Sequence, residues 1–130
     1  MKTILVDAAY TFVLKDENII DQKLYSLLEE YENPKIILTN ANEEQKKTYG
    51  LVDLPYPLFT LSHEPNKDNP TYFRKMLENF NLEIEDVVYF EHSQDAVESA
   101  KSVGIKSYHF NHEERDLISL KGFLDEALKG

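Results

Sequence analysis

The sequence contains no cysteine, which excludes disulfide bonds, thiolate nucleophiles and zinc sites with cysteine ligands. Basic residues are also few, because 14 Lys and Arg stand against 24 Asp and Glu, for a net charge of -10. This balance disfavours binding to nucleic-acid backbones and anionic membranes, since both carry negative charge themselves. We therefore expect no nucleic-acid partner and no membrane partner.

Long apolar runs are also missing. No stretch approaches the roughly 20 residues that cross a bilayer, and the apolar run within residues 1–7 is too short for a signal peptide. The 130 residues are 42% hydrophobic and 29% charged, a composition typical of globular proteins. We expect a single domain over residues 1–130 and a cytoplasmic location.

Short apolar runs alternate with segments of helical spacing. The strand-like runs are rich in β-branched, aromatic and leucine residues and cover 4–6, 36–38, 58–61, 87–90 and 106–110. Runs of this kind are typical of strands covered on both faces, as in a parallel sheet. Apolar stripes with helical spacing occur within 24–31, 73–80, 96–103 and 117–128. The sequence predicts an α/β fold, a doubly wound, mostly parallel sheet of about five strands with helices on both faces.

Several residues mark where the predicted helices begin and end. Asn42 and Gln45 form a capping-box pattern, and Pro70 suits the first turn of the helix that continues to residue 80. Asn81 and Gly104 are placed to end helices in left-handed caps. Residues 11–20 break the alternation and are predicted to form a small hairpin directly after the first strand.

Polar residues follow three of the predicted strands. Asp7 ends the first, Thr39 and Asn40 the second, and Glu91 and His92 follow the strand over 87–90. Open α/β sheets place ligands at this carboxyl edge, where a carboxylate can attack phosphorus and a hydroxyl can hold phosphate oxygens. Each residue also has an ordinary structural explanation as a cap or turn residue, because Asp, Asn and Thr favour those positions themselves.

The order of these segments carries a family resemblance. Lys67-Asp68-Asn69-Pro70 resembles the Lys-Pro-Asp-Pro helix entry of the haloacid dehalogenase-like (HAD) superfamily, and residues 87–93 resemble the acidic strand end of that superfamily. The hairpin after Asp7 resembles its flap. The intervals between the motifs are too short for a cap domain, so the resemblance implies the smallest, capless architecture.

The resemblance also implies roles for these residues. Members are mainly phosphohydrolases that work through an aspartyl-phosphate, so Asp7 is the expected nucleophile and Lys67 the group that neutralises its charge. Thr39 and Asn40 would hold the phosphate of a small phosphorylated molecule. Magnesium is the implied cofactor, and its expected ligands are Asp7, the backbone carbonyl of Ala9, Glu91 and His92.

The sequence departs from the family pattern at the predicted pocket. Ala9 stands where the phosphatases have an aspartate that transfers protons, a loss commonly worth 10²–10⁴-fold in rate. Tyr10 replaces a glycine of the turn, His92 an acidic metal ligand, and Ala96 a polar residue that steadies Lys67. Two hypotheses therefore stay open, a phosphohydrolase with altered chemistry and a non-catalytic HAD-fold protein that binds a ligand or a partner protein. A receiver domain is disfavoured because the middle apolar run ends in Leu61-Ser62, without an aspartate.

Overall fold

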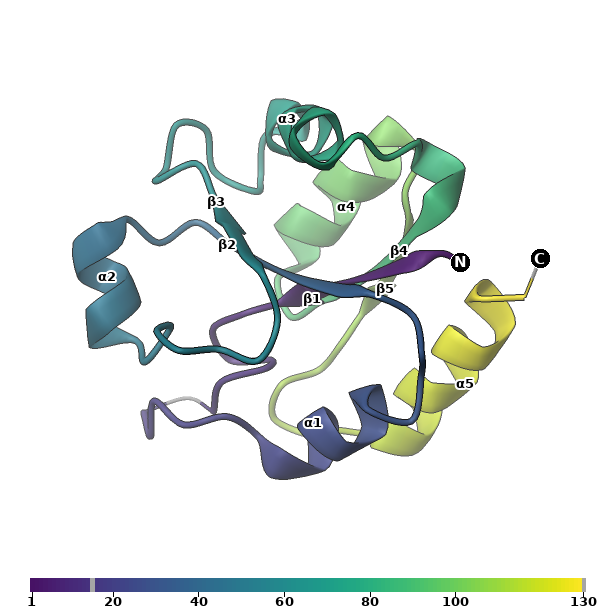
Figure 1. The fold of residues 1–130 in the computed structure, drawn as a ribbon, viewed down its shortest axis with the longest axis horizontal. Helices are drawn as coiled ribbons and strands as arrows, with labels where there is room; N and C mark the ends of the chain where they lie inside the picture. The colour runs from purple at the N-terminus through teal and green to yellow at the C-terminus, as the bar shows by residue number, and fades with distance from the viewer. Residues whose placement is uncertain (15, 130) are drawn as a thin grey trace.

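The computed structural model describes residues 1–14 and 16–129, and its elements alternate between strand and helix (Figure 1). In chain order they are β1 (Thr3–Asp7), α1 (Gln22–Leu28), β2 (Lys35–Thr39), α2 (Glu43–Thr48), β3 (Leu58–Thr60), α3 (Pro70–Phe80), the 3₁₀ helix η1 (Ile84–Asp86), β4 (Val87–Glu91), α4 (Gln94–Val103), β5 (Lys106–His109) and α5 (Leu117–Ala127). The five strands pair in the order β3-β2-β1-β4-β5, and every pairing is parallel. The predicted doubly wound sheet is confirmed.

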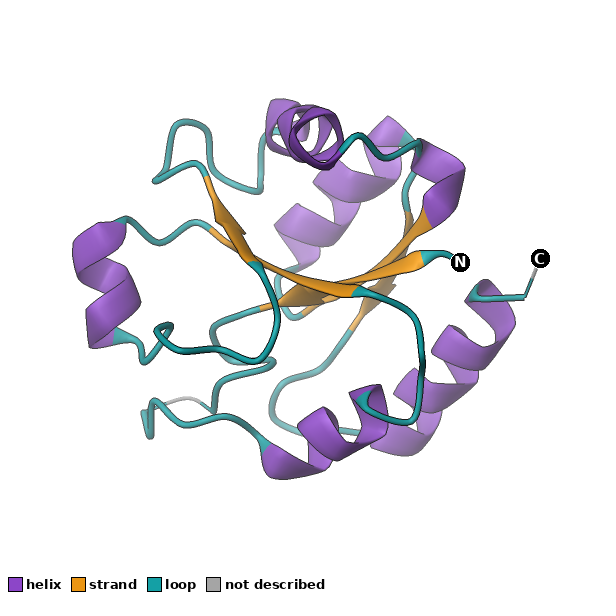
Figure 2. Cartoon of the chain, viewed as in Figure 1, coloured by secondary structure: helices purple, strands orange, loops and turns teal. Residues whose placement is uncertain are grey.

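Helices cover both faces of the sheet (Figure 2). On one face, α1 and α5 bury Leu24, Leu28 and Leu120 against Ile4 and Val6 of β1, together with further apolar residues of the same cluster. On the other face, the Tyr72 to Leu77 stretch of α3 and Ala100 of α4 pack against neighbouring strands. Successive strand residues point to opposite faces, so β1, β2, β3 and β4 each contribute to both clusters. That two-sided burial explains the continuous apolar runs in the sequence.

The predicted helix caps form as the sequence indicates. The capping box of Asn42 and Gln45 opens α2, and Pro70 occupies the first turn of α3. Asn81 and Gly104 end α3 and α4 in the left-handed conformation. α2 buries no side chain and lies beside the sheet, where Figure 1 shows it apart from the other helices. Among the described residues, no helix is long and apolar enough to cross a membrane.

The segment between β1 and α1 folds back on itself. An antiparallel bridge joins Val13 to Ile20, the Leu14 N–H donates to the Ile19 carbonyl, and the Asp21 N–H donates to the Phe12 carbonyl. The pairing is too short to form named strands, but it has the predicted hairpin arrangement; Lys15, which the prediction included, lies outside the described residues. Because this flap follows Asp7 directly, its residues are placed beside the end of β1.

Candidate functional site

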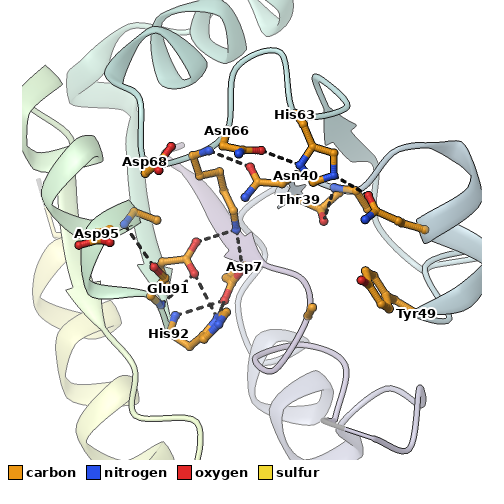
Figure 3. A pocket seen from close by; sticks show the side chains of 16 residues that line it. Asp7, Thr39, Asn40, Tyr49, His63, Asn66, Asp68, Glu91, His92 and Asp95 are labelled. Carbon is orange, nitrogen blue, oxygen red and sulfur yellow. Dashed lines mark hydrogen bonds and ion pairs between the residues drawn. The ribbon is translucent and has the colours of Figure 1, made fainter.

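A pocket of about 350 Å³ opens at the carboxyl edge of the sheet, where β1, β2 and β4 end (Figure 3). All the residues predicted from the sequence to form the site line it: Asp7, Ala9, Thr39, Asn40, Lys67, Glu91 and His92. They come together because parallel strands end at one edge, although they are far apart in the chain. The structure thus gathers the predicted set in one place, and the chemical role of each residue remains a prediction.

Asp7 is the last residue of β1 and is only 1% exposed. Its Oδ1 accepts a hydrogen bond of 2.6 Å from Lys67 Nζ, and its Oδ2 accepts one of 2.6 Å from the Thr11 hydroxyl. The backbone N–H of His92 also donates to Oδ2, at 3.2 Å, and so does the His92 ring through Nδ1. Burial by itself raises the pKa of Asp7, but the charge of Lys67 and the bond from His92 outweigh it and hold that pKa far below its usual value.

Lys67 lies in the turn that leads into α3 and is 6% exposed. Its Nζ also donates to Glu91 Oε1 at 2.7 Å, so one ammonium bridges two carboxylates from different strands. Burial lowers the pKa of Lys67, but the negative charges of Asp7 and Glu91 have the larger combined effect and raise it above its ordinary value. Lys67 is therefore charged at neutral pH.

Glu91 ends β4 and is fully buried. Besides Lys67, its Oε1 accepts a hydrogen bond from the Tyr89 hydroxyl, while its Oε2 accepts one of 3.0 Å from the Ser93 N–H. Burial and the neighbouring charge of Glu91 raise the pKa of Tyr89 well above its ordinary value, which keeps this hydroxyl protonated as a donor. This contact was not predicted from the sequence. The signal was available, because residues two apart on a strand share a face.

His92 directly follows β4, and its side chain is 21% exposed. Its Nδ1 contacts Asp7 Oδ2 and lies 3.2 Å from Glu91 Oε2. An ionised carboxylate only accepts hydrogen bonds, so Nδ1 must carry the proton. Burial lowers the pKa of His92, but the bonds to the two carboxylates raise it to about 9 overall.

The second wall of the pocket comes from the end of β2. The Thr39 hydroxyl accepts a hydrogen bond of 3.2 Å from the Ala41 N–H, and Asn40 Oδ1 accepts one of 2.7 Å from the Lys67 N–H. Asn40 thus fixes the backbone of Lys67. Position 96, where the family pattern has a polar residue that steadies this lysine, holds Ala96 in the pocket lining. Asn40 is therefore a positioning residue for Lys67 in this structure.

Tyr10 retains the turn geometry that the family pattern assigns to glycine. Its φ of 69° lies in the left-handed region, which is costly for a residue with a Cβ. Its side chain does not line the pocket that contains Asp7. The Tyr10 ring stacks on the His112 ring with centroids 5.4 Å apart, and it meets the His92 ring edge-on with centroids 5.1 Å apart. The side chain therefore covers His92 and leaves the pocket open.

Two further residues, which support the site without lining the pocket, were missed by sequence reasoning. Thr11 bonds Asp7 from within the flap, four positions along the chain, where no regular element fixes its direction. Arg115 binds Asp21 through Nε at 3.0 Å and donates from Nη1 to the Tyr10 carbonyl at 2.7 Å. Nothing in the sequence signals this clamp, because Arg115 and Asp21 are 94 residues apart.

Comparison with known proteins bears on the fold. No family model and no curated protein sequence matches the chain. Among solved structures, an uncharacterised protein from Corynebacterium glutamicum superposes with a TM-score of 0.61 at 20% identity, over 100% of this chain and 98% of the other. A provisionally named beta-phosphoglucomutase from Thermotoga maritima gives a TM-score of 0.58 at 14% identity, over 84% and 85%. The core domain of a provisionally named phosphoglycolate phosphatase from Streptococcus pneumoniae gives 0.55 at 18%, over 84% and 79%.

These identities are low, so the similarity concerns the fold. The last two neighbours are HAD proteins, and the chain has a HAD-like fold, as the motif order predicted. Its five-stranded parallel sheet, with only the flap between β1 and α1, is consistent with the capless form.

Proposed function

We propose that this HAD-like domain is of the phosphohydrolase type, and that it binds the phosphoryl group of a small phosphorylated molecule and receives it on Asp7. The observation that carries the proposal is the buried ion pair of Asp7 and Lys67, which lines a pocket together with Thr39 and Asn40. Ligands of open α/β sheets bind at this edge. Phosphoryl transfer depends on positioning and charge neutralisation, which such a pair supplies.

The reaction follows from these groups. The lowered pKa keeps Asp7 ionised, so its carboxylate forms a bond to phosphorus while the ester P–O bond breaks. Water supplies the proton to the leaving oxygen, since Ala9 has no proton to give. A second water then hydrolyses the acyl phosphate, releasing inorganic phosphate and restoring Asp7. We expect slow turnover, because the general acid is worth about 10²–10⁴-fold in rate.

Specific observations also favour a non-catalytic binding role. Both oxygens of Asp7 already accept hydrogen bonds from side chains, which reduces the electron density available for attack. Ala9, at the same edge of the sheet, has no carboxyl group that could transfer a proton to the leaving group. In this alternative the pocket still holds a phosphorylated ligand or a partner's phosphate, but no bond to phosphorus forms.

The deciding experiment measures turnover of a panel of phosphomonoesters, with and without Mg²⁺, by the wild-type protein, Asp7→Asn and Asp86→Asn. Asp86 is exposed in η1, before β4, and serves as the matched control because it undergoes the same change of charge. We expect turnover in the wild type and the control, and none in Asp7→Asn. Equal activity in all three contradicts the proposal. Stabilisation by inorganic phosphate with no turnover in any of them supports the binding alternative.

A further inference from the structure

The protein itself already satisfies both carboxylates of the site. Asp7 Oδ1 accepts from Lys67 Nζ at 2.6 Å. Asp7 Oδ2 accepts from the Thr11 hydroxyl at 2.6 Å, from the His92 N–H at 3.2 Å and from the His92 ring. A carboxylate offers about four lone-pair sites in all, so Asp7 has little capacity left for another ligand.

Glu91 is saturated in the same way. Its Oε1 accepts from Lys67 Nζ at 2.7 Å and from the Tyr89 hydroxyl. Its Oε2 accepts from the Ser93 N–H at 3.0 Å, with His92 Nδ1 at 3.2 Å. Because the side chain is fully buried, no face of it is turned to water.

Magnesium does not fit the donor set in this arrangement. Asp7, Glu91 and His92 bring one ligand atom each to within 4.8 Å of one another, the one such group found among residues 1–14 and 16–129. Mg²⁺ requires near-octahedral oxygen ligands at about 2.0–2.1 Å and binds imidazole nitrogen poorly. Here the imidazole nitrogen stands between Asp7 Oδ2 and Glu91 Oε2, where a bridging cation would have to sit.

Charge gives the same result. Asp7 and Glu91 carry two negative charges, and the buried Lys67 ammonium with the His92 ring provides two donors facing them. A divalent cation added to this set would lie against both donor groups, at a site with little water to screen the repulsion. Entry of the metal therefore requires the His92 ring to leave both carboxylates.

We propose that the His92 imidazole takes the place of a divalent cation between Asp7 and Glu91, so that the site is assembled without metal. The Tyr10 and His112 rings hold the imidazole there, with centroids 5.1 Å and 5.4 Å from it. This inference rests on the proposed function in one respect only, namely that the ligand of the pocket is a phosphate oxyanion. Accordingly, no step of the proposed phosphoryl transfer to Asp7 uses a metal.

The test compares thermal melts of the wild-type protein and His92→Asp in EDTA and in millimolar Mg²⁺. Replacing His92 by aspartate removes the imidazole and supplies a hard oxygen ligand, so we expect Mg²⁺ to raise the Tm of His92→Asp by several degrees and to leave that of the wild type unchanged. His63→Asp is the matched control: it makes the same change on the opposite wall of the pocket, and Mg²⁺ should not shift its Tm. A wild-type shift as large as that of His92→Asp overturns the proposal.

A second measurement decides the matter if His92→Asp does not fold. Mn²⁺ is titrated into the wild-type protein and into Asp7→Asn, and free Mn²⁺ is followed by electron paramagnetic resonance. We expect the two proteins to leave the same fraction of Mn²⁺ free. Stoichiometric binding by the wild type that disappears in Asp7→Asn overturns the proposal.

Inorganic phosphate added in EDTA separates this inference from the proposed function. Stabilisation of the wild type by phosphate without metal supports both. Absence of any phosphate effect, with the Tm of the wild type still insensitive to Mg²⁺, counts against the proposed function and leaves the role of His92 intact. A phosphate effect that appears only with Mg²⁺ overturns the role of His92 while supporting phosphate binding.

Discussion

Lys67 Nζ lies 2.6 Å from Asp7 Oδ1, and the side chains of the two residues are only 7% and 2% exposed. They are 60 positions apart in the chain, so their ion pair fixes the turn before α3 to the end of β1. An unpaired buried charge is costly, and each partner therefore depends on the other. The pair serves the fold as well as the proposed chemistry.

The first prediction concerns Lys67→Met, which keeps the length of the side chain and removes its charge. Asp7 and Glu91 are then left buried and facing each other without a bridging ammonium. Breaking a buried ion pair on one side commonly costs about 3–5 kcal/mol, and we expect a loss of that size in the free energy of unfolding from urea titrations. Lys75→Met, on the exposed side of α3, is the control and should stay within about 0.5 kcal/mol of the wild type. A similarly small effect at Lys67 contradicts the prediction.

The second prediction concerns the Tyr72 hydroxyl. It donates to the carbonyl of Thr39, at the end of β2, at 2.9 Å and lies 3.3 Å from the carbonyl of Phe59 in β3. Tyr72→Phe leaves these buried acceptors without the donor, so we expect the free energy of unfolding to fall by about 1–3 kcal/mol. Tyr49→Phe changes an exposed ring in the same way and should have little effect. Equal urea midpoints for the two variants exclude a structural role for the Tyr72 hydroxyl.

Periodicity predicted the sheet because each strand is covered on both faces, and the helix caps were readable because they depend on local residues. Tyr31 shows the limit of this reasoning: it shares the stripe of Leu24 and Leu28, but α1 ends at Leu28 and the tyrosine packs from the following turn. Its hydroxyl bonds Asp125 of α5, a partner that no local pattern could supply.

The position of the candidate site was predictable because parallel strands end at one edge. The contacts within it were less so. Asp7, Glu91 and His92 were predicted to converge and they do, but the direct contact of the His92 ring with Asp7, a residue 85 positions away, was not predicted. Whether the His92 ring contacts a metal ion or the Asp7 carboxylate depends on how the Tyr10 and His112 rings pack against it. Both rings come from other segments, and the sequence alone does not show this packing.

The third prediction is a pH dependence that originates in His92. Burial lowers its pKa, but the hydrogen bonds and charges of Asp7 and Glu91 outweigh burial and raise the pKa from an ordinary value of 6.5 to about 9. Lys67 faces the same two carboxylates. A raised pKa in the folded state means that the contribution of His92 to stability is full below about pH 6.5 and declines as the pH rises through about 9.

The measurement compares the free energies of unfolding of the wild type and His92→Asn at several pH values from 6 to 10. We expect the stability advantage of the wild type to shrink as the pH rises. The Tyr10 and His112 rings also face His92, and they are present in both proteins. A difference that is constant across this range shows that His92 does not change charge there.

The fourth prediction concerns the flap. Arg115 donates to Asp21 and to the carbonyls of Tyr10 and Thr11, and so ties the flap to the segment before α5. Thr11 in turn donates to Asp7, which makes Arg115 a positioning residue for the site although it does not line the pocket. Arg115→Met removes a charge-assisted contact and leaves both carbonyls without the guanidinium. We expect a loss of about 1.5–3 kcal/mol, measured by urea unfolding.

Hydrogen exchange can distinguish local loosening of the flap from a general loss of stability. The Leu14 amide bonds the Ile19 carbonyl inside the flap, and the Ile37 amide bonds the Pro57 carbonyl at the sheet. In Arg115→Met the Leu14 amide should exchange faster by a larger factor than the Ile37 amide, because flaps open locally before the sheet does. In Arg115→Lys the exchange rate of the Leu14 amide should lie between those of the wild type and Arg115→Met, since an ammonium cannot reproduce the planar fork of donors. Equal acceleration at both amides would show that Arg115 stabilises the whole domain and does not hold the flap in particular.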